Sequence, residues 1–546
     1  MRGTDYFEAY LDDFDKIVIY FSKQSYDGYS RQFFLRDVFG NIETLNIQSI
    51  EPVGNSYTKY ICRIPHPIEI GKEYEVLHQY ARSTPLNYSY IVKRPQFDEM
   101  FAYEGNDLGA TYTPQSTKFV IWAPTAAKAC LAIELNDKLD IHVMERGEKG
   151  TYSITLEGDY ELAEYAYIVR VNGKWNETLD PYGKASTVNS RRSVVVDPQK
   201  VKVKPTNLPP LRSNTEAIIY EASVRDFTMQ PNIGVKNPGK FKGFVEENEK
   251  TRSLNTGFSY LKTLGVTHVQ LMPVLDFGSV DEYNQKLFYN WGYDPLQYMV
   301  LEGSYGSYSF DPMSRIYDFC ELVDQLHANG MRVILDVVFN HVFDMPTSSF
   351  ELMVPGYYFQ MNEAGSYSNG TWCGNDFDSS RKMGHKFIVD ACVYLTKTFG
   401  IDGFRFDLMG ILDVDTINEV VRRCKEINRS FMVYGEGWDM PSYLDPQKRA
   451  SMFNHQKMPC VAHFSDRFRD VIKGRTSVDE VDVKGYCTND TSLIEITKDV
   501  LSASVGGYGV PTYFSNPQQA LISFFWFHVN FRIVCSNSAK KMTLTI

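Results

Sequence analysis

The chain has 546 residues, of which 43% are hydrophobic and 23% charged, and this composition excludes a disordered or fibrous protein. A net charge of −11 disfavours a nucleic-acid partner, because such proteins usually carry a basic patch. No stretch approaches about 18 consecutive apolar residues, so we expect no membrane span. Aromatic residues make up 14% of the chain. Most of these rings will be core, but the excess also fits a neutral ligand with apolar faces, such as a sugar.

The cysteines and the first residues bear on cellular location. The nine cysteines are odd in number and scattered, without CxxC pairs, which predicts free thiols in a reducing compartment. The opening MRGTDYFEAYLDDFDK lacks a basic segment followed by an apolar run, so no secretory signal is expected. We therefore expect a cytoplasmic protein.

The first two hundred residues have the pattern of β domains. Short β-like runs (KIVIYF, RQFFLRDVF, KYICRI, YSYIVKR) separated by turn residues predict a small β-sandwich over residues 1–94. A second β-rich unit, residues 95–201, runs from YEGNDLGATYT through KFVIWAPTA to VVVDPQK, and we expect another sandwich. The polar, Pro-rich stretch KVKPTNLPPLRSN, residues 202–214, is the predicted linker.

From residue 215 to 546 apolar runs of strand length alternate with helical stripes. AIIYEASV and HVQLMPV are predicted strands, with the helix FSYLKTLG between them. SRIYDFCELVDQLHANG is a helix that stops at Gly330 and leads at once into the strand MRVILDVVF. The helices HKFIVDACVYLTKTFG and TINEVVRRCKEIN repeat this design. Such alternation predicts a parallel sheet covered by helices, and we expect a (β/α)8 TIM barrel with a long inserted loop at residues 342–384.

Two carboxylates stand at predicted strand ends. Arg405 and Asp407, in DGFRFDLMG, lie two apart, so their side chains share one side of a strand. Glu436 follows 29 residues later, one αβ unit, and would occupy the same rim of the barrel. Two carboxylates so placed can hydrolyse a glycosidic bond, and the cation lowers the pKa of the nucleophile. The alternative interpretation is a set of ion pairs that only satisfies neighbouring strands.

Other polar residues end the same strands. DVVFNH contributes Asp336, Asn340 and His341, and Trp438 follows Glu436. Taken alone, His341 would more often be a core histidine than a ligand.

Several motifs in one order carry a family resemblance. DVVFNH, GFRFDLMG, YGEGW and YNWGYDP resemble the α-amylase family of glycoside hydrolases, and YNWGYDP is similar to the type I pullulanases. FDEMFAYEGNDLGATYTP and KFVIWAPTA resemble the carbohydrate-binding module that precedes the barrel in debranching enzymes. The resemblance extends from about residue 94 to 522. It implies β-sandwich modules, with residues 1–94 as a candidate glucan-binding domain, followed by the catalytic TIM barrel.

The resemblance implies retaining, pullulanase-type hydrolysis of α-1,6-glucosidic linkages in pullulan, limit dextrins and glycogen-like glucans. Asp407 would be the nucleophile and Glu436 the general acid/base. Asp336, His341 and Arg405 would surround the scissile sugar, Tyr293 would stack on it, and Trp438 would flank the leaving group.

No cofactor is implied for this reaction. Calcium is an optional ion among loop carboxylates such as Asp376 and Asp378, for which solvated loop charges are the favoured interpretation.

The C-terminal part departs from the family pattern. These hydrolases use a third carboxylate in an HDN-like motif at the end of the seventh strand, whereas ISFFWFHVN places Val529 at that position. Since the side chain of Val accepts no hydrogen bond, and since the sequence ends at Ile546 before an eighth strand, we expect an incomplete barrel with impaired activity. Two alternatives follow: an isoamylase or branching-type enzyme of the same family, or a non-catalytic α-glucan-binding protein.

Overall fold

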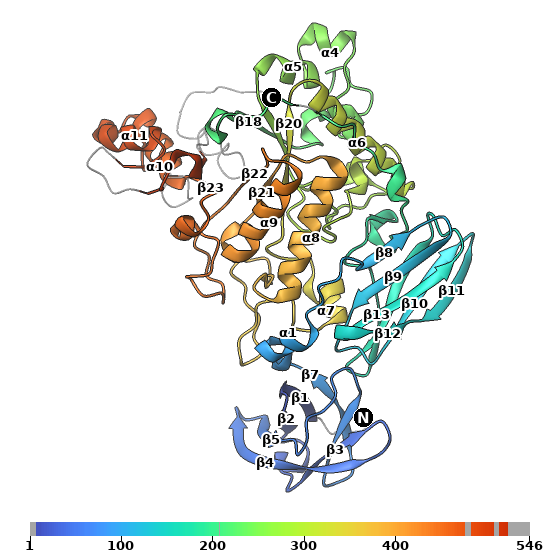
Figure 1. The fold of residues 1–546 in the computed structure, drawn as a ribbon. Coiled ribbons are helices and arrows are strands. Elements are labelled where there is room, and N and C mark those ends of the chain that lie inside the picture. Colours follow the sequence, from blue (N-terminus) through green and yellow to red (C-terminus); the bar gives the residue numbers. More distant parts are fainter. Residues whose placement is uncertain (1–6, 207, 476–481, 507–512, 522–546) are drawn as a thin grey trace.

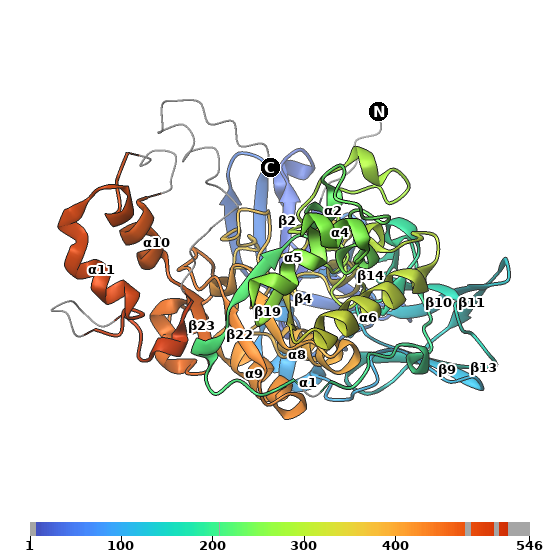
Figure 2. The same cartoon turned by 90° about the horizontal axis from the view of Figure 1, so that it is seen from above.

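A computed structural model describes residues 7–206, 208–475, 482–506 and 513–521, which form three modules in chain order (Figure 1). A β-barrel stands at one end, a β-sandwich lies beside it, and a parallel sheet covered by helices makes up the rest. Figures 1 and 2 both place helices α10 and α11 to one side of that sheet.

The first module is a closed barrel, where the strand pattern predicted a sandwich. Its strands pair in the order β1-β2-β5-β4-β3-β6-β7, and β1 returns to pair with β7. The long strand β4 links the two halves of the barrel, because its first residues pair with β3 and the remainder with β5, with a register shift between Ile47 and Ser49. The strands are β1 Phe7–Asp13, β2 Lys16–Ser22, β3 Phe33–Asp37, β4 Ile42–Val53, β5 Tyr57–Arg63, β6 Tyr74–His78 and β7 Ser83–Tyr88.

The run YSYIVKR is only partly a strand: β7 ends at Tyr88, and Tyr90–Lys93 is a 3-10 helix followed by α1 (Pro95–Phe101).

The second module is the expected sandwich, with sheets ordered β11-β10-β14-β17-β16 and β12-β13-β9-β8, and with β15 paired to β14. Two-residue turns at Asn136–Asp137 and Asn172–Gly173 join hairpins, and all four residues have the positive φ that such turns need. The strands are β8 Gly109–Tyr112, β9 Ser116–Trp122, β10 Lys128–Leu135, β11 Lys138–Val143, β12 Glu145–Arg146, β13 Thr151–Glu157, β14 Glu164–Val171, β15 Lys174–Thr178, β16 Ala185–Ser186 and β17 Ser193–Val194.

The third module contains seven parallel strands within the described ranges, in the order β18 to β24. These are β18 Ile219–Ala222, β19 His268–Leu271, β20 Arg332–Val337, β21 Gly403–Phe406, β22 Met432–Gly435, β23 Val461–Phe464 and β24 Ala520–Leu521. The alternation of strands and helices predicted from the sequence is confirmed. Val529 and the remainder of the C-terminal segment lie outside the described residues, so the missing carboxylate and the incomplete barrel stay predictions.

The helices begin and end at the residues that the sequence favours. Asp311 accepts the Met313 N–H at the start of α6, Asp413 accepts the Thr416 N–H at the start of α9, and α8 ends at Gly400 with φ of 64°. The helices are α2 Asp226–Met229, α3 Phe241–Phe244, α4 Glu249–Leu254, α5 Gly257–Leu264, α6 Pro312–Ala328, α7 Ser349–Met353, α8 Lys382–Phe399, α9 Val414–Ile427, α10 Asp466–Lys473 and α11 Ile494–Leu501.

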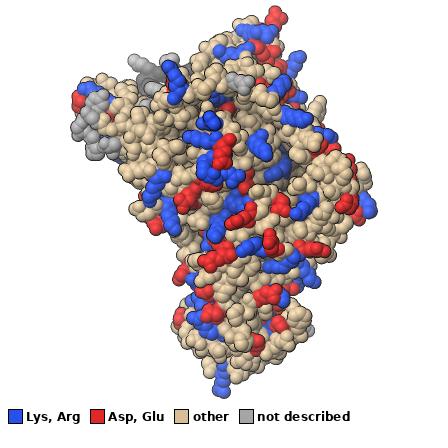
Figure 3. Space-filling view, viewed as in Figure 1, with Lys and Arg blue, Asp and Glu red and all other residues tan. Residues whose placement is uncertain are grey.

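The surface shows no grouping of one charge sign on the face in Figure 3, where acidic and basic side chains are interspersed. None of the helices in the described ranges combines the length and the apolar character needed to cross a membrane.

A buried polar lock joins the segment after the first module to the insertion at 342–384. The Lys93 ammonium donates to the Tyr357 carbonyl at 2.9 Å, to the Phe359 carbonyl, and to the Asp378 carboxylate at 2.7 Å. The side chain of Lys93 is only 5% exposed. Because a buried charge needs a partner, this lock fixes the insertion relative to the N-terminal half of the chain.

We predict that Lys93→Ala lowers the free energy of unfolding by about 3–5 kcal/mol, because it leaves the Asp378 carboxylate buried without its cation. Thermal and urea unfolding measure this loss. Lys72→Ala is the matched control, since Lys72 forms its ion pair with Glu69 at the surface and its removal should leave stability unchanged. Equal effects of the two substitutions would refute a structural role for the lock.

Candidate active site

Three neighbouring strands bring the predicted catalytic residues to one edge of the sheet. In the parallel register Asp336 of β20 pairs with Arg405 of β21. Asp407 directly follows β21 and donates its N–H to the Val337 carbonyl, while Glu436 directly follows β22 and donates to the Phe406 carbonyl, both at 3.0 Å. The carboxyl ends of β20, β21 and β22 therefore meet, which is where barrel enzymes build their active sites.

One guanidinium binds three carboxylates at this edge. Arg405 Nη1 lies 2.9 Å from Asp336 Oδ1 and 2.7 Å from Asp407 Oδ1, and Nη2 lies 2.7 Å from Glu436 Oε1. Arg405 is 3% exposed, and Asp407 and Glu436 are 8% and 7% exposed. The planar fork of Arg suits such a multiple contact, and a Lys ammonium would not reproduce it. Asp407 and Glu436 are thus held together on the two nitrogens of one buried group.

Asp336 has both carboxylate oxygens occupied. The Tyr293 hydroxyl donates to Asp336 Oδ2 at 2.8 Å, and Oδ1 accepts from Arg405. Burial raises the pKa of Asp336 from 3.8 to about 7, against the lowering effect of Arg405 and with a further increase from the charge of Asp407. The pKa of Tyr293 is raised well above its usual range by burial and by the charge of Asp336. Tyr293 therefore stays a neutral donor that orients Asp336.

His341 reaches the cluster through Asn340. The Asn340 side-chain amide donates to the Asp407 carbonyl at 2.8 Å and to Asp407 Oδ2 at 3.0 Å. Since its N–H groups face Asp407, its Oδ1 is the acceptor for His341 Nδ1 at 2.5 Å. Burial lowers the pKa of His341, against the raising effects of the Asp407 charge and of a hydrogen bond with the Tyr293 backbone. Asn340 is among the polar residues predicted at this strand end, but no role at the site was predicted for it.

The backbone after the strands contributes a further contact that sequence reasoning missed. Leu408 has a φ of 38°, in the left-handed region that a branched residue rarely adopts, and its N–H donates to Glu436 Oε2 at 3.2 Å. Trp438 is half-buried, two residues beyond Glu436. Its carbonyl packs against Gly410, where a Cβ atom would approach to 1.8 Å. The loops after β21 and β22 are thereby held together.

The two carboxylates suggested as calcium ligands do not fit a metal site. Asp376 accepts from the Gly370 N–H, the Thr371 N–H and the Ser368 hydroxyl, and Asp378 is paired with Lys93. Both side chains are buried, so the favoured interpretation as solvated loop charges is also wrong. Their oxygens are already satisfied by protein donors. Within the described ranges no group of three or more His, Cys, Asp or Glu is arranged to hold a metal.

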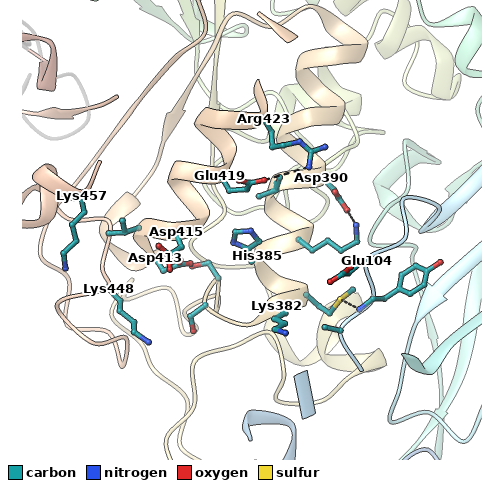
Figure 4. A pocket seen from close by; sticks show the side chains of 18 of the residues that line it. Glu104, Lys382, His385, Asp390, Asp413, Asp415, Glu419, Arg423, Lys448 and Lys457 are labelled. Atoms are coloured by element: carbon teal, nitrogen blue, oxygen red, sulfur yellow. Dashed lines mark hydrogen bonds and ion pairs between the residues drawn. The ribbon is translucent and has the colours of Figure 1, made fainter. Parts of the chain in front are cut away.

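A cavity of about 750 Å³ lies apart from the Arg405 cluster (Figure 4). It is bounded by α8, α9 and residues 102–106, and its walls carry both charge signs, as in Glu104, Lys382, Glu419 and Arg423. None of the seven predicted site residues lines it. We therefore place the candidate active site at the strand ends and not in this cavity.

Comparison with known proteins agrees with this arrangement. Models of the pullulanase N1-terminal domain, of carbohydrate-binding module 48 (isoamylase N-terminal domain) and of the α-amylase catalytic domain match residues 7–93, 107–183 and 253–352. A pullulanase of Bacillus subtilis (strain 168) is 36% identical over 544 residues, which cover 98% of this chain and 75% of that protein.

The crystal structure of a pullulanase from Anoxybacillus sp. LM18-11 superposes with a TM-score of 0.89 at 41% identity, covering 94% of this chain and 73% of that one. A structure of the same enzyme complexed with maltotriose has a TM-score of 0.87 at 42% identity, with coverages of 92% and 72%. The chain thus spans about three quarters of the length of these relatives. From its domain order, its strand-end carboxylates and its similarity over nearly the whole sequence, the chain belongs to the pullulanase family of glycoside hydrolases.

Proposed function

We propose that the protein hydrolyses α-1,6-glucosidic linkages in pullulan, limit dextrins and glycogen-like glucans, with retention of configuration. The observation that carries this proposal is the pair Asp407 and Glu436, bound to the two nitrogens of the buried Arg405 guanidinium at adjacent strand ends. Retaining glycosidases need two carboxyl groups about 5–5.5 Å apart, one on each side of the scissile bond. The bound maltotriose in the related Anoxybacillus enzyme supports an α-glucan as the substrate.

Asp407 attacks the anomeric carbon in this mechanism, and Glu436 donates a proton to the leaving glycosidic oxygen. Glu436 then removes a proton from the water that hydrolyses the glycosyl ester. The amide of Asn340 and the Arg405 guanidinium hold the Asp407 carboxylate in one orientation, so no reorganisation is needed during attack.

Asp336 acts as a positioning residue. Its two oxygens are occupied by Arg405 and Tyr293 and it is 1% exposed, so it holds those two side chains and does not touch the sugar. Three buried carboxylates against one guanidinium would carry excess negative charge if all were ionised. The raised pKa of Asp336 means that the cluster keeps a proton near neutral pH.

We also propose a cytoplasmic location. The eight cysteines in the described ranges are all free thiols, which suits a reducing compartment.

The products formed from pullulan test the proposed function. An α-1,6-specific pullulanase releases maltotriose, whereas an isoamylase or branching-type enzyme gives a different product pattern. Binding of pullulan by folded protein without any release of sugar would instead identify a non-catalytic α-glucan-binding protein.

We predict that Glu436→Gln lowers kcat for pullulan by about 10²–10⁴-fold, because the leaving oxygen loses its proton donor. Asp407→Asn should lower it at least as much, because no covalent intermediate can form. Reducing-sugar release and chromatography of the products measure both. Asp137→Asn, in an exposed hairpin turn of the sandwich, is the matched control and should keep full activity. Activity within tenfold of wild type in either active-site variant would exclude the assigned roles.

We predict that Asp336→Asn makes protein stability less dependent on pH. A carboxyl whose pKa is raised on folding, here from 3.8 to about 7, adds stability below pH 4 that is lost as the pH rises through 7. The loss is about 4 kcal/mol at most, and an amide at this position does not undergo it.

Urea unfolding of both proteins between pH 5 and pH 8 measures this difference. As the pH rises, the free energy of unfolding of wild type should fall relative to that of Asp336→Asn. Stability curves that run parallel across this range would show that Asp336 does not hold the proton.

A further inference from the structure

Trp372 is an exposed tryptophan in an unusual backbone conformation. Its side chain is 71% exposed, and its φ is 60°, in the left-handed region that bulky residues rarely occupy. It stands at the tip of a tight turn, where its N–H donates to the Asn369 carbonyl at 3.3 Å. Strained conformations persist only where the surroundings enforce them, and they concentrate at functional sites.

The turn that carries Trp372 is rigidly supported. Asp376, which is fully buried, accepts hydrogen bonds from the Gly370 and Thr371 N–H groups at 2.7 and 2.9 Å. The Thr371 hydroxyl donates to the Asn375 carbonyl at 2.7 Å, and the Gly374 N–H donates to Asn369 Oδ1 at 2.7 Å. The exposed ring is therefore presented by a fixed scaffold.

The same turn borders the candidate active site on two sides. Asn375 exchanges two hydrogen bonds with the backbone of Val342, the residue after His341, at 2.8 and 2.9 Å. On the other side the Tyr443 N–H donates to Ser368 Oγ at 3.2 Å, which ties the turn to the loop of Trp438.

Cys373, the neighbour of Trp372, gives a further indication of this proximity. Its thiol pKa is raised first by burial and then by the negative charge of Asp407, which places the tip of the turn within the field of the proposed nucleophile.

We propose that Trp372 is an additional binding platform for an α-glucan, on which a glucose ring outside the scissile position stacks. This inference rests on the proposed function. Glucose rings present apolar C–H faces, an indole is the largest aromatic surface available to meet them, and the loss of exposed indole area favours binding. The flanking loops expose two more rings, Phe343 at 44% and Tyr443 at 51%, so exposed aromatic side chains also stand on the two loops to which the turn is bonded. The continuity with the active site identifies the occupant as the substrate chain.

Trp372→Gly is the sharpest test, because glycine adopts a φ of 60° without strain and the thermal unfolding temperature should not fall. We expect KM for pullulan to rise roughly three- to tenfold while kcat changes less than twofold. Trp372→Phe keeps an aromatic ring and should recover most of the lost affinity. Tyr317→Ala, which removes a 45% exposed ring from the outer side of α6, should change neither constant.

Two kinetic outcomes would overturn the inference. An unchanged KM in Trp372→Gly would show that the ring does not contact substrate. A fall in kcat at constant KM would show that the turn only positions the catalytic groups. Partial rescue by Trp372→Phe is the signature that a merely structural role would not give.

Calorimetry with maltohexaose separates this inference from the proposed function. If the wild-type chain does not hydrolyse pullulan, the proposed function fails. Trp372 is then assessed by the dissociation constant alone: a weaker Kd in Trp372→Gly supports the platform, and an equal Kd, or no binding by wild type, overturns it.

Discussion

A single buried cation organises the catalytic edge of this protein. Arg405 lies on β21, between β20, which carries Asp336, and β22, which Glu436 directly follows. It reaches these two carboxylates as well as Asp407, which directly follows β21. Without the guanidinium three carboxylates would lie close together in a region of low dielectric constant. The strands can approach because Gly403 and Gly435 lie against neighbouring backbone, where a Cβ atom would come within 2.6 and 2.5 Å of a carbonyl oxygen. The close packing of the strands is therefore what brings the three carboxylates within reach of one guanidinium.

The insertion at 342–384 connects this edge to the rest of the molecule. At its base Lys93 and Arg381 bind across the boundary between the N-terminal segment and the third module, with Arg381 Nη2 3.0 Å from Asp98 Oδ2. At its tip Asn375 is bonded to the backbone next to His341. The same segment thus carries the exposed Trp372 and fixes it to two different parts of the fold. Through this segment, contacts of the N-terminal half of the chain are linked to the residues beside His341.

The sequence patterns predicted the repeating units and much of the site, for identifiable reasons. Helical spacing and terminal glycines located α5, α6 and α8, and the spacing of two residues placed Arg405 and Asp407 on one side of a strand, where they are 2.7 Å apart. Contacts that depend on how distant segments pack could not be predicted from the sequence. Examples are the hydrogen bond from the Asn340 amide to Asp407 and the ion pair between the buried Asp378 and a lysine 285 residues away. Alternation along strands fits a sandwich and a barrel equally, so the closure of the first module was missed. Nothing in TWCGND signals the left-handed backbone of Trp372.

The Lys93 lock has a consequence for how the chain is made. Domains fold largely as units during synthesis, with the N-terminal ones first. The first barrel and the sandwich can therefore form while the ribosome is still translating the third module. Lys93, however, meets Asp378 only after 285 more residues have emerged, and until then it must stay hydrated. The contact between Lys93 and the central insertion is therefore formed later than the contacts of the sandwich with residues 276–297, in the order set by translation.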